Sequence, residues 1–322
     1  MQRNPFLKLL LLTALVSSLG ACALLQTEEP DKSPLRVAYT QWWGDYTLLV
    51  AQEKGLFEKY GVEVEPVYYE FFSKTYSSLA SGQIDGALIA AGDTINIDRS
   101  ARMKVVGVSD DGGADAIVVN SEINSIQELK GKTVGVLLGT QYELMFTEML
   151  RSVNMNAGDV TFVGIEPENA SDALKKGQVQ AVYTWEPHLS EALSNGNKII
   201  YPKEKTRLFP DMIVFSNSIV TQRPEDIRAF LQAWFAAVEY RLQNPQETQA
   251  IAAKYLGIRI EDVPLDDNLK ILSLEENRTL FEIQEENSIY AVTRRTSEYL
   301  ISIGALAQQI DPLELIDPTY LP

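Results

Sequence analysis

Short apolar runs alternate with helical segments along residues 35–216. The apolar runs are three to seven residues long. Most helical segments between them end at a glycine, which is a common residue just past a helix. The predicted strands are 35–39, 62–65, 84–90, 105–108, 116–120, 133–138, 159–165, 179–184, 199–201 and 212–216. Such alternation is typical of an α/β fold with a mostly parallel sheet.

The helical segments carry recognisable start signals. Ser125 and Glu128 have capping-box spacing, Gly139-Thr140-Gln141 leads into a predicted helix of about fourteen residues, and Pro187 stands at a predicted first helical position. A glycine followed by a buried strand occurs at both Gly82 and Gly177. This weak internal similarity favours two similar lobes. The chain after Pro224 is predicted to be mostly helical.

The amino terminus has the form of a secretory signal peptide over residues 1–21. A short positive segment precedes an apolar run that is too brief to cross a bilayer. The sequence Leu19-Gly20-Ala21-Cys22 resembles a bacterial lipobox, so Cys22 is expected to carry the lipid; the alternative is an ordinary signal with an accidental cysteine. Residues 22–34 are then an acylated tether, and the protein is expected to be extracytoplasmic and membrane-anchored.

The charge balance excludes several function classes. The 322 residues include 28 Lys and Arg against 44 Asp and Glu, a formal net charge of −16, which argues against nucleic-acid binding. A single Cys and a single His rule out a Cys/His zinc cage and an intramolecular disulfide. A Ser–His–Asp triad would need His188, which is expected to lie on a helix surface. No metal or cofactor is predicted.

Several motifs together resemble one family. They are the segments 55–64 (GLFEKYGVEV), 79–85 (LASGQID), 129–135 (LKGKTVG), Trp185-Glu186-Pro187, Asn244-Pro245 before 254–257, and 315–318 (LIDP). In this order they resemble type II periplasmic substrate-binding proteins, in the branch of ABC importers for nitrate, sulfonates, taurine and thiamine precursors.

The resemblance implies two α/β lobes with a small solute bound between them. Lobe I would comprise residues 35–117 and 214–322, lobe II would comprise 118–213, and crossings are expected near 116–120 and 212–216. It also implies an ABC permease as partner, a monomer, and no enzymatic activity. The alternatives are an enzyme of the same fold related to thiamine-pyrimidine synthesis, a nitrate or sulfonate binder, and a sensing module, which is disfavoured because no signalling domain follows in this sequence.

Ligands of open α/β sheets bind beyond the carboxyl ends of the strands, near helix N-termini. The loops predicted there give the candidate ligand-binding residues: Trp42, Trp43, Tyr46, Gly92, Asp93, Asp115, Gly139, Thr140, Gln141, Trp185 and Glu186. One of the two adjacent tryptophans is expected to face the core. Gly139 and Thr140 are expected either to hold a sulfonate or carboxylate by backbone N–H groups or to form a plain capped turn.

The charges of these loops indicate the kind of solute. They contain Asp45, Asp93, Asp110, Asp111, Asp115 and Glu186, but no Lys or Arg. Acids together with aromatic rings suit an amine or a heteroaromatic ring, through charge pairing and cation–π contact. Asp115 and Asp93 are the preferred pair. The solute is predicted to be amine-bearing, a zwitterionic sulfonate or heteroaromatic, and its identity stays open.

Overall fold

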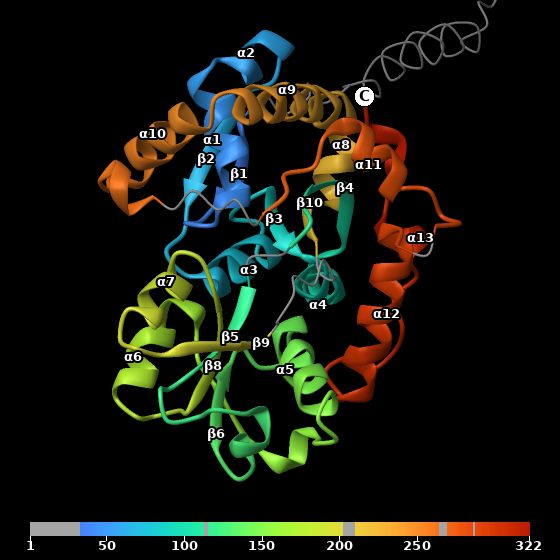
Figure 1. The fold of residues 1–322 in the computed structure, drawn as a ribbon. Helices are drawn as coiled ribbons and strands as arrows, with labels where there is room; N and C mark the ends of the chain where they lie inside the picture. Colours follow the sequence, from blue (N-terminus) through green and yellow to red (C-terminus); the bar gives the residue numbers. More distant parts are fainter. Residues whose placement is uncertain (1–32, 113–114, 202–209, 264–268, 286) are drawn as a thin grey trace, which may run out of the picture. The chain divides into compact units, whose positions relative to one another are not determined.

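The computed structural model describes residues 33–112, 115–201, 210–263, 269–285 and 287–322 (Figure 1). The described strands form two five-stranded sheets. The first sheet has the order β2 (Val64–Tyr68), β1 (Leu35–Tyr39), β3 (Gly86–Ala90), β10 (Asp211–Ser216) and β4 (Met103–Asp110). The second has the order β7 (Thr161–Gly164), β6 (Thr133–Val136), β8 (Ala181–Trp185), β5 (Asp115–Val119) and β9 (Lys198–Tyr201).

The two sheets share one topology. In each, four strands run in one direction and a single strand, β10 or β5, runs antiparallel between its neighbours. The antiparallel strand is the one that the chain forms directly after it crosses from the other sheet. The predicted α/β class with two mostly parallel, helix-flanked lobes is therefore confirmed.

Both antiparallel strands begin at the same kind of place. Asp211, the first residue of β10, pairs with the carboxyl ends of β3 and β4, and Asp115, the first residue of β5, pairs with Trp185 at the carboxyl end of β8. All of β5 lies in the second sheet and all of β10 in the first. Because the predicted boundaries after residues 117 and 213 fall inside these strands, we propose to place them before the strands.

Helices cover the sheets. In lobe I they are α1 (Tyr46–Glu53), α2 (Leu56–Tyr60), α3 (Phe72–Ala80) and α4 (Ala91–Ala101). Along the second sheet they are α5 (Gln141–Arg151), α6 (Ala170–Lys175) and α7 (His188–Leu193). After β10 follow α8 (Asn217–Gln222), α9 (Pro224–Gln243), α10 (Pro245–Leu256), α11 (Leu274–Leu280), α12 (Ile289–Ser302) and α13 (Pro312–Leu315).

The long helix α9 packs on α1 and α2 and closes one face of the first sheet (Figure 1). Its apolar stripe is fully buried because Phe230 stacks on Phe57 at 5.3 Å between ring centroids and meets Phe215 of β10 edge-on at 5.1 Å. Aromatic pairs of this geometry add to the free energy of burial. The stripe brings Arg241, near the end of α9, into the interior.

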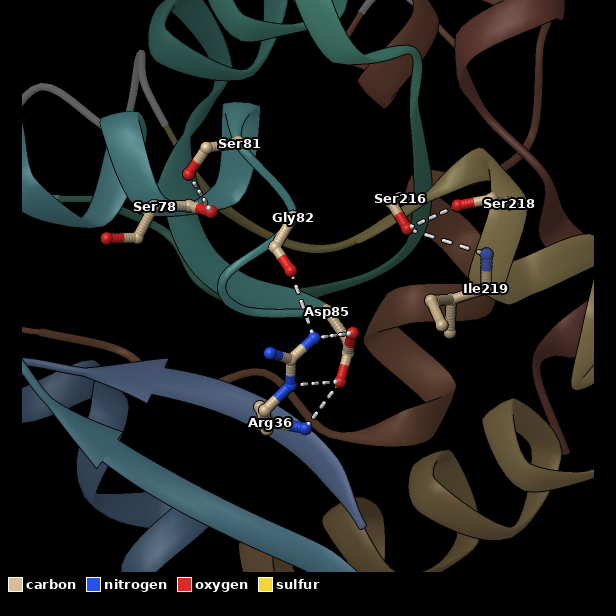
Figure 2. A network of polar contacts seen from close by, with 8 residues as sticks. All are labelled: Arg36, Ser78, Ser81, Gly82, Asp85, Ser216, Ser218 and Ile219. Atoms are coloured by element: carbon tan, nitrogen blue, oxygen red, sulfur yellow. Dashed lines mark hydrogen bonds and ion pairs between the residues drawn. The ribbon is translucent and has the colours of Figure 1, made fainter. Parts of the chain in front are cut away.

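The motif at residues 79–85 directly precedes β3 and has a structural role at that end of the first sheet. Figure 2 shows the Arg36 guanidinium on the Asp85 carboxylate, with Nη2–Oδ1 at 2.7 Å and Nε–Oδ2 at 3.2 Å. Arg36 also donates from Nη2 to the Gly82 carbonyl at 3.1 Å. A two-pronged pair of this kind fixes orientation as well as energy, so it anchors the start of β3 to β1.

Some local predictions are wrong. Ser125 makes no side-chain cap; Glu128 accepts hydrogen bonds from the Asn124 N–H and the Ser125 hydroxyl, and the segment is a short 3-10 helix. The turn predicted at 92–94 is already the first turn of α4, because Ala91 continues directly from β3. Helix α5 has 11 residues, and Pro187 caps α7 from the position before it.

The predicted signal peptide, Cys22 and nearly all of the tether lie outside the described residues. Across the ranges given above, no helix combines the length and the apolar character that a membrane crossing needs.

Candidate functional site

A small cavity lies where the strand ends of the two sheets meet. Residues from both lobes line it: Trp42, Phe72, Gly112, Asp115, Gln141, Tyr142, Trp185 and Asp211. The space inside it that the centre of a water molecule can occupy is about 10 Å³, which is room for about one water molecule. The structure therefore describes this site in a closed arrangement.

Aromatic rings form the walls of the cavity. Tyr142 and Trp185 lie 4.8 Å apart between ring centroids, with a tilt of 38°. Phe72, at the start of α3 in lobe I, meets Trp185 of lobe II edge-on at 5.0 Å. The indole of Trp42 is oriented by a 3.3 Å hydrogen bond from Nε1 to Oδ2 of Asp110. Ring faces fixed in this way can stack on a flat solute or attract a cation.

Two sets of carboxylates surround the same cavity, one lining it and one buried further from it. Asp115 and Asp211 line the cavity, whereas three further aspartates, Asp45, Asp93 and Asp110, are buried around it. The deeper carboxylates have partners: the Thr40 hydroxyl donates to Asp45 at 2.8 Å, and the Ser109 hydroxyl donates to Asp110 at 2.8 Å. The Tyr183 hydroxyl donates to Asp115.

Burial dominates the protonation behaviour of these acids. It raises the pKa of Asp45, Asp93 and Asp110 from 3.8 to about 7 in each case, although the hydrogen bonds they accept pull the other way. The pKa of Asp211 is raised well above its usual value, first by burial and then by the carboxylates of Asp110 and Asp45. Folding thus gathers several carboxyl groups in a place that disfavours their charged forms.

One buried cation faces this cluster. The Arg241 guanidinium donates to the Trp43 carbonyl at 3.0 Å and to the Thr47 hydroxyl at 2.6 Å, and it lies 4.8 Å from the Trp43 ring centroid. Burial lowers the pKa of Arg241 to about 10, while the carboxylate of Asp110 opposes that shift. Arg241 does not line the cavity, so it compensates the deeper acids from behind.

The ligand-free chain is expected to be more stable at about pH 5 than at about pH 8. Asp45, Asp93 and Asp110 have a pKa of about 7 when folded, against an ordinary 3.8. Between these values the folded state binds more protons than the unfolded state, so the free energy of unfolding falls as pH rises. One pKa unit corresponds to about 1.4 kcal/mol, and from pH 5 up to the folded pKa of about 7 the difference in bound protons extends over about two pH units, which gives a loss on the order of 3 kcal/mol per group.

His188 opposes this trend, because burial lowers its pKa to about 4 and favours folding at higher pH. It is a single group against at least three carboxyl groups, so the net sign is set by the acids. Urea denaturation at the two pH values measures the difference. Equal stability at both, or lower stability at pH 5, would contradict the burial of these carboxyl groups.

Four of the residues predicted to bind ligand line the cavity: Trp42, Asp115, Gln141 and Trp185. Trp42 and Trp43 divide as expected, since Trp43 packs against Tyr46 at 5.2 Å and under Arg241 in the interior. The Tyr46 hydroxyl donates to the Gln41 carbonyl at 2.9 Å. Neither Trp43 nor Tyr46 borders the cavity.

The other predicted residues serve local structure. The Glu186 carboxylate accepts hydrogen bonds from the N–H and hydroxyl of Ser190 at the start of α7. Thr140 caps α5 by accepting from the Tyr142 N–H at 3.2 Å. Gly92, Asp93 and Gly139 take part in contacts between α4 and the start of α5, described below. His188, predicted to be on a helix surface, has a side chain only 12% exposed, so that prediction is wrong.

Asp211 and Phe72 line the cavity but were not predicted from the sequence, whereas Gly112 and Tyr142 lie in strand-end loops predicted to face the ligand but were not among the candidate residues. For Asp211 a signal was present: a strand that enters a sheet antiparallel begins where its neighbours end. In the described parts of the chain, no group of three or more His, Cys, Asp or Glu residues is placed to hold a metal ion.

Comparison with known proteins adds to this picture. The family model described as NMT1/THI5 like matches residues 45–248. A provisionally named binding protein of Brucella abortus is 27% identical over 255 residues, covering 76% of this chain and 79% of its own length. A provisionally named aliphatic sulfonates-binding protein of Bacillus subtilis is 29% identical over 236 residues, covering 69% of each chain.

Solved structures share the fold. The periplasmic aliphatic sulphonate binding protein SsuA of Escherichia coli superposes with a TM-score of 0.69 at 19% identity, covering 90% of this chain and 94% of its own. The desulfurization enzyme DSZB superposes with a TM-score of 0.63 at 16% identity, covering 90% and 97%. A binding protein and an enzyme therefore share this fold, and the fold by itself does not decide between binding and catalysis.

Proposed function

The chain belongs to the NMT1/THI5-like family, and on that premise we propose that it is an extracytoplasmic solute-binding protein for a small cationic or heteroaromatic solute. The solute would lie between the two lobes, at the cavity bounded by Trp42, Trp185 and Asp211. The relatives named as binding proteins support the solute-binding role. The class of solute is argued from the charges of the cavity.

The observation that carries the proposal is a pair of cavity-lining carboxylates, Asp115 and Asp211, between aromatic walls. The eight described lining residues include no Lys or Arg. An ammonium or protonated ring nitrogen placed there would pair with a buried carboxylate through a charge-assisted hydrogen bond. It would also compensate the burial and the neighbouring carboxylates that together raise the pKa of Asp211. A cation is thus the charge that complements the lining of this cavity.

A plain anion fits the site less well. The start of α5 was expected either to hold a sulfonate or carboxylate or to form a plain capped turn, and two of the N–H groups there are already engaged. The Gly139 N–H donates to Glu143 at 2.9 Å, and the Tyr142 N–H donates to Thr140. An anion would also face the carboxylates of Asp115 and Asp211. The relatives named for sulfonates therefore do not determine the solute of this chain.

The lining also favours binding over catalysis. Among the described lining residues there is no Ser, Cys, Lys or His; Asp115, Asp211 and Tyr142 could act as acid or base, but the two carboxylates are also the groups that would pair with a cation. In addition, the closed cavity has room for only about one water molecule. A solute can enter only if the lobes separate, as expected for a protein that captures a solute by closing around it.

Calorimetric titration with a solute panel tests the proposal. The panel contains primary amines, aminopyrimidines, taurine, alkanesulfonates and nitrate. We expect binding by amines or aminopyrimidines, with an affinity that falls as the pH is lowered from about 8 to 5, because protons then compete for the carboxylates. Tight binding of nitrate or alkanesulfonates alone would refute the charge argument and leave the solute-binding role intact.

We propose further that the protein is anchored through Cys22 and delivers its solute to an ABC permease. The lipobox at residues 19–22 motivates the anchor, and a relative from Brachyspira hyodysenteriae named as an ABC transporter periplasmic binding protein supports the partner. Cys22→Ser should release the protein from the membrane fraction and block its processing. Unchanged membrane association of this variant would contradict lipidation.

A further inference from the structure

Helix α4 of lobe I and helix α5 of lobe II lie next to each other (Figure 1). Two hydrogen bonds join them. The Gly92 N–H on α4 donates to Oε1 of Gln141 on α5 at 2.9 Å, and Nδ2 of Asn96 donates to the Gly139 carbonyl at 2.9 Å. Both hydrogen bonds connect one lobe to the other, so both must break when the lobes separate.

A third connection runs through the Asp93 carboxylate. The Tyr76 hydroxyl of α3 donates to Oδ2 of Asp93 at 2.7 Å, within lobe I. The Tyr142 hydroxyl, from lobe II, approaches the same carboxylate and acts to lower the pKa of Asp93, against the larger effect of burial. Asp93 is 1% exposed and does not line the cavity. In the closed arrangement its carboxylate is occupied by tyrosine hydroxyls of both lobes rather than facing a solute.

Gly92 is what permits this approach. A Cβ atom at position 92 would lie 2.8 Å from Cβ and 3.2 Å from the backbone nitrogen of Gln141. Carbon atoms do not approach to 2.8 Å, and a backbone nitrogen cannot swing aside as the end of a long side chain can. The contact is therefore specific to glycine in the closed arrangement, whereas within α4 itself alanine is the better helix former.

We propose that these contacts form a clasp that holds the two lobes closed without a solute. The clasp comprises Gly92, Asp93 and Asn96 on α4, with Gly139, Gln141 and Tyr142 at the start of α5. It rests on the same closed site as the proposed function and adds a control of affinity to it. Because the closed cavity has room for only about one water molecule, a solute has to open the clasp before it binds, so apparent affinity falls as the clasp becomes more stable.

Distance measurement between spin labels tests the clasp without any solute. In the full chain with Cys22→Ser, labels are attached at Lys74→Cys on α3 and Lys175→Cys at the end of α6, both exposed and in different lobes. The parent is expected to show mainly one short distance. Gly92→Ala should shift the major population to a longer distance while cooperative thermal unfolding is retained, since α4 accommodates alanine.

Asn96→Ala is the second variant and decides the matter if Gly92→Ala fails to fold; it should add a longer component by removing one connection. The matched control is Asn195→Ala, whose side chain donates to Ser171 within lobe II at 3.3 Å and should leave the distance unchanged. A parent already at the long distance, or variants that match the parent, would overturn the clasp. Neither result bears on which solute binds, so the proposed function is tested separately.

Discussion

Replacing Arg241 by Met is expected to lower the free energy of unfolding by about 3–5 kcal/mol, because removing one partner of a buried charge arrangement leaves the other uncompensated. Arg241 is 3% exposed, and its guanidinium donates to the carbonyls of Trp43 and Gly44 and to the Thr47 hydroxyl. Methionine fills a similar volume but offers no donor. Two buried carbonyls would lose hydrogen bonds, and Asp45 and Asp110 would lose their nearby positive charge.

Arg228→Met is the matched control on the same helix. The Arg228 side chain is 42% exposed, pairs with Glu225 at 2.7 Å and lies 5.2 Å from the Tyr320 ring centroid. Pairs of this exposed kind contribute at most about 1 kcal/mol. Urea denaturation of both variants at neutral pH gives the comparison. Equal losses in the two variants would show that Arg241 acts as an ordinary packed side chain and does not compensate the acids.

The strand and helix order could be predicted from the sequence because each element has a local signal. Gly55, Gly61, Gly82 and Gly177 all have positive φ in the structure, and each follows the helix or turn that it was predicted to end. The element boundaries were less accurate. The strand predicted at 62–65 is β2 at Val64–Tyr68, because its extent is set by pairing with β1 along the whole of Leu35–Tyr39.

The candidate site could be predicted only in part, because two features of it are not local. Asp211 lines the cavity since β10 enters the first sheet antiparallel, and strand direction depends on where the chain crosses between lobes. Arg241 reaches the acids from α9, about 200 residues beyond the loop that it supports, so an inventory of loop charges could not include it.

The third feature that could not be predicted from the sequence is how deeply each aspartate is buried beside the cavity. Asp93 and Asp115 were the preferred pair, yet Asp115 lines the cavity while Asp93 is buried behind it between two tyrosine hydroxyls. Asp93 follows the carboxyl end of β3 in the first sheet and Asp115 begins β5 in the second, so their positions relative to the strands do not predict which of them is deeper. What separates them is the packing of α3 and α5 over Asp93, which only the closed arrangement of both lobes creates.

Asp211→Asn is expected to weaken binding of a cationic solute strongly while making the empty protein more stable. Loss of one partner of a buried charge pair costs about 2–5 kcal/mol of binding free energy, or about 30-fold to several thousand-fold in affinity. The backbone of Asp211 is held by β3 and β4, and an amide of the same shape leaves that pairing intact.

The gain in stability has the same origin as the loss in binding. Burial first, and then the negative charges of Asp110, Asp45 and Asp115, raise the pKa of Asp211 well above the ordinary range. At about pH 8, where repulsion is greatest, a neutral amide should raise the free energy of unfolding by about 1 kcal/mol or more, as is common when a functional site is relieved of strain.

Asp172→Asn on α6, where the carboxylate pairs with Lys176 in solvent, should change neither binding affinity nor stability appreciably. Calorimetry with the amine or aminopyrimidine that binds the parent, together with urea denaturation, measures both. A variant that keeps its affinity, or that loses affinity and stability together, would show that Asp211 supports the fold and is not the anionic contact of the solute.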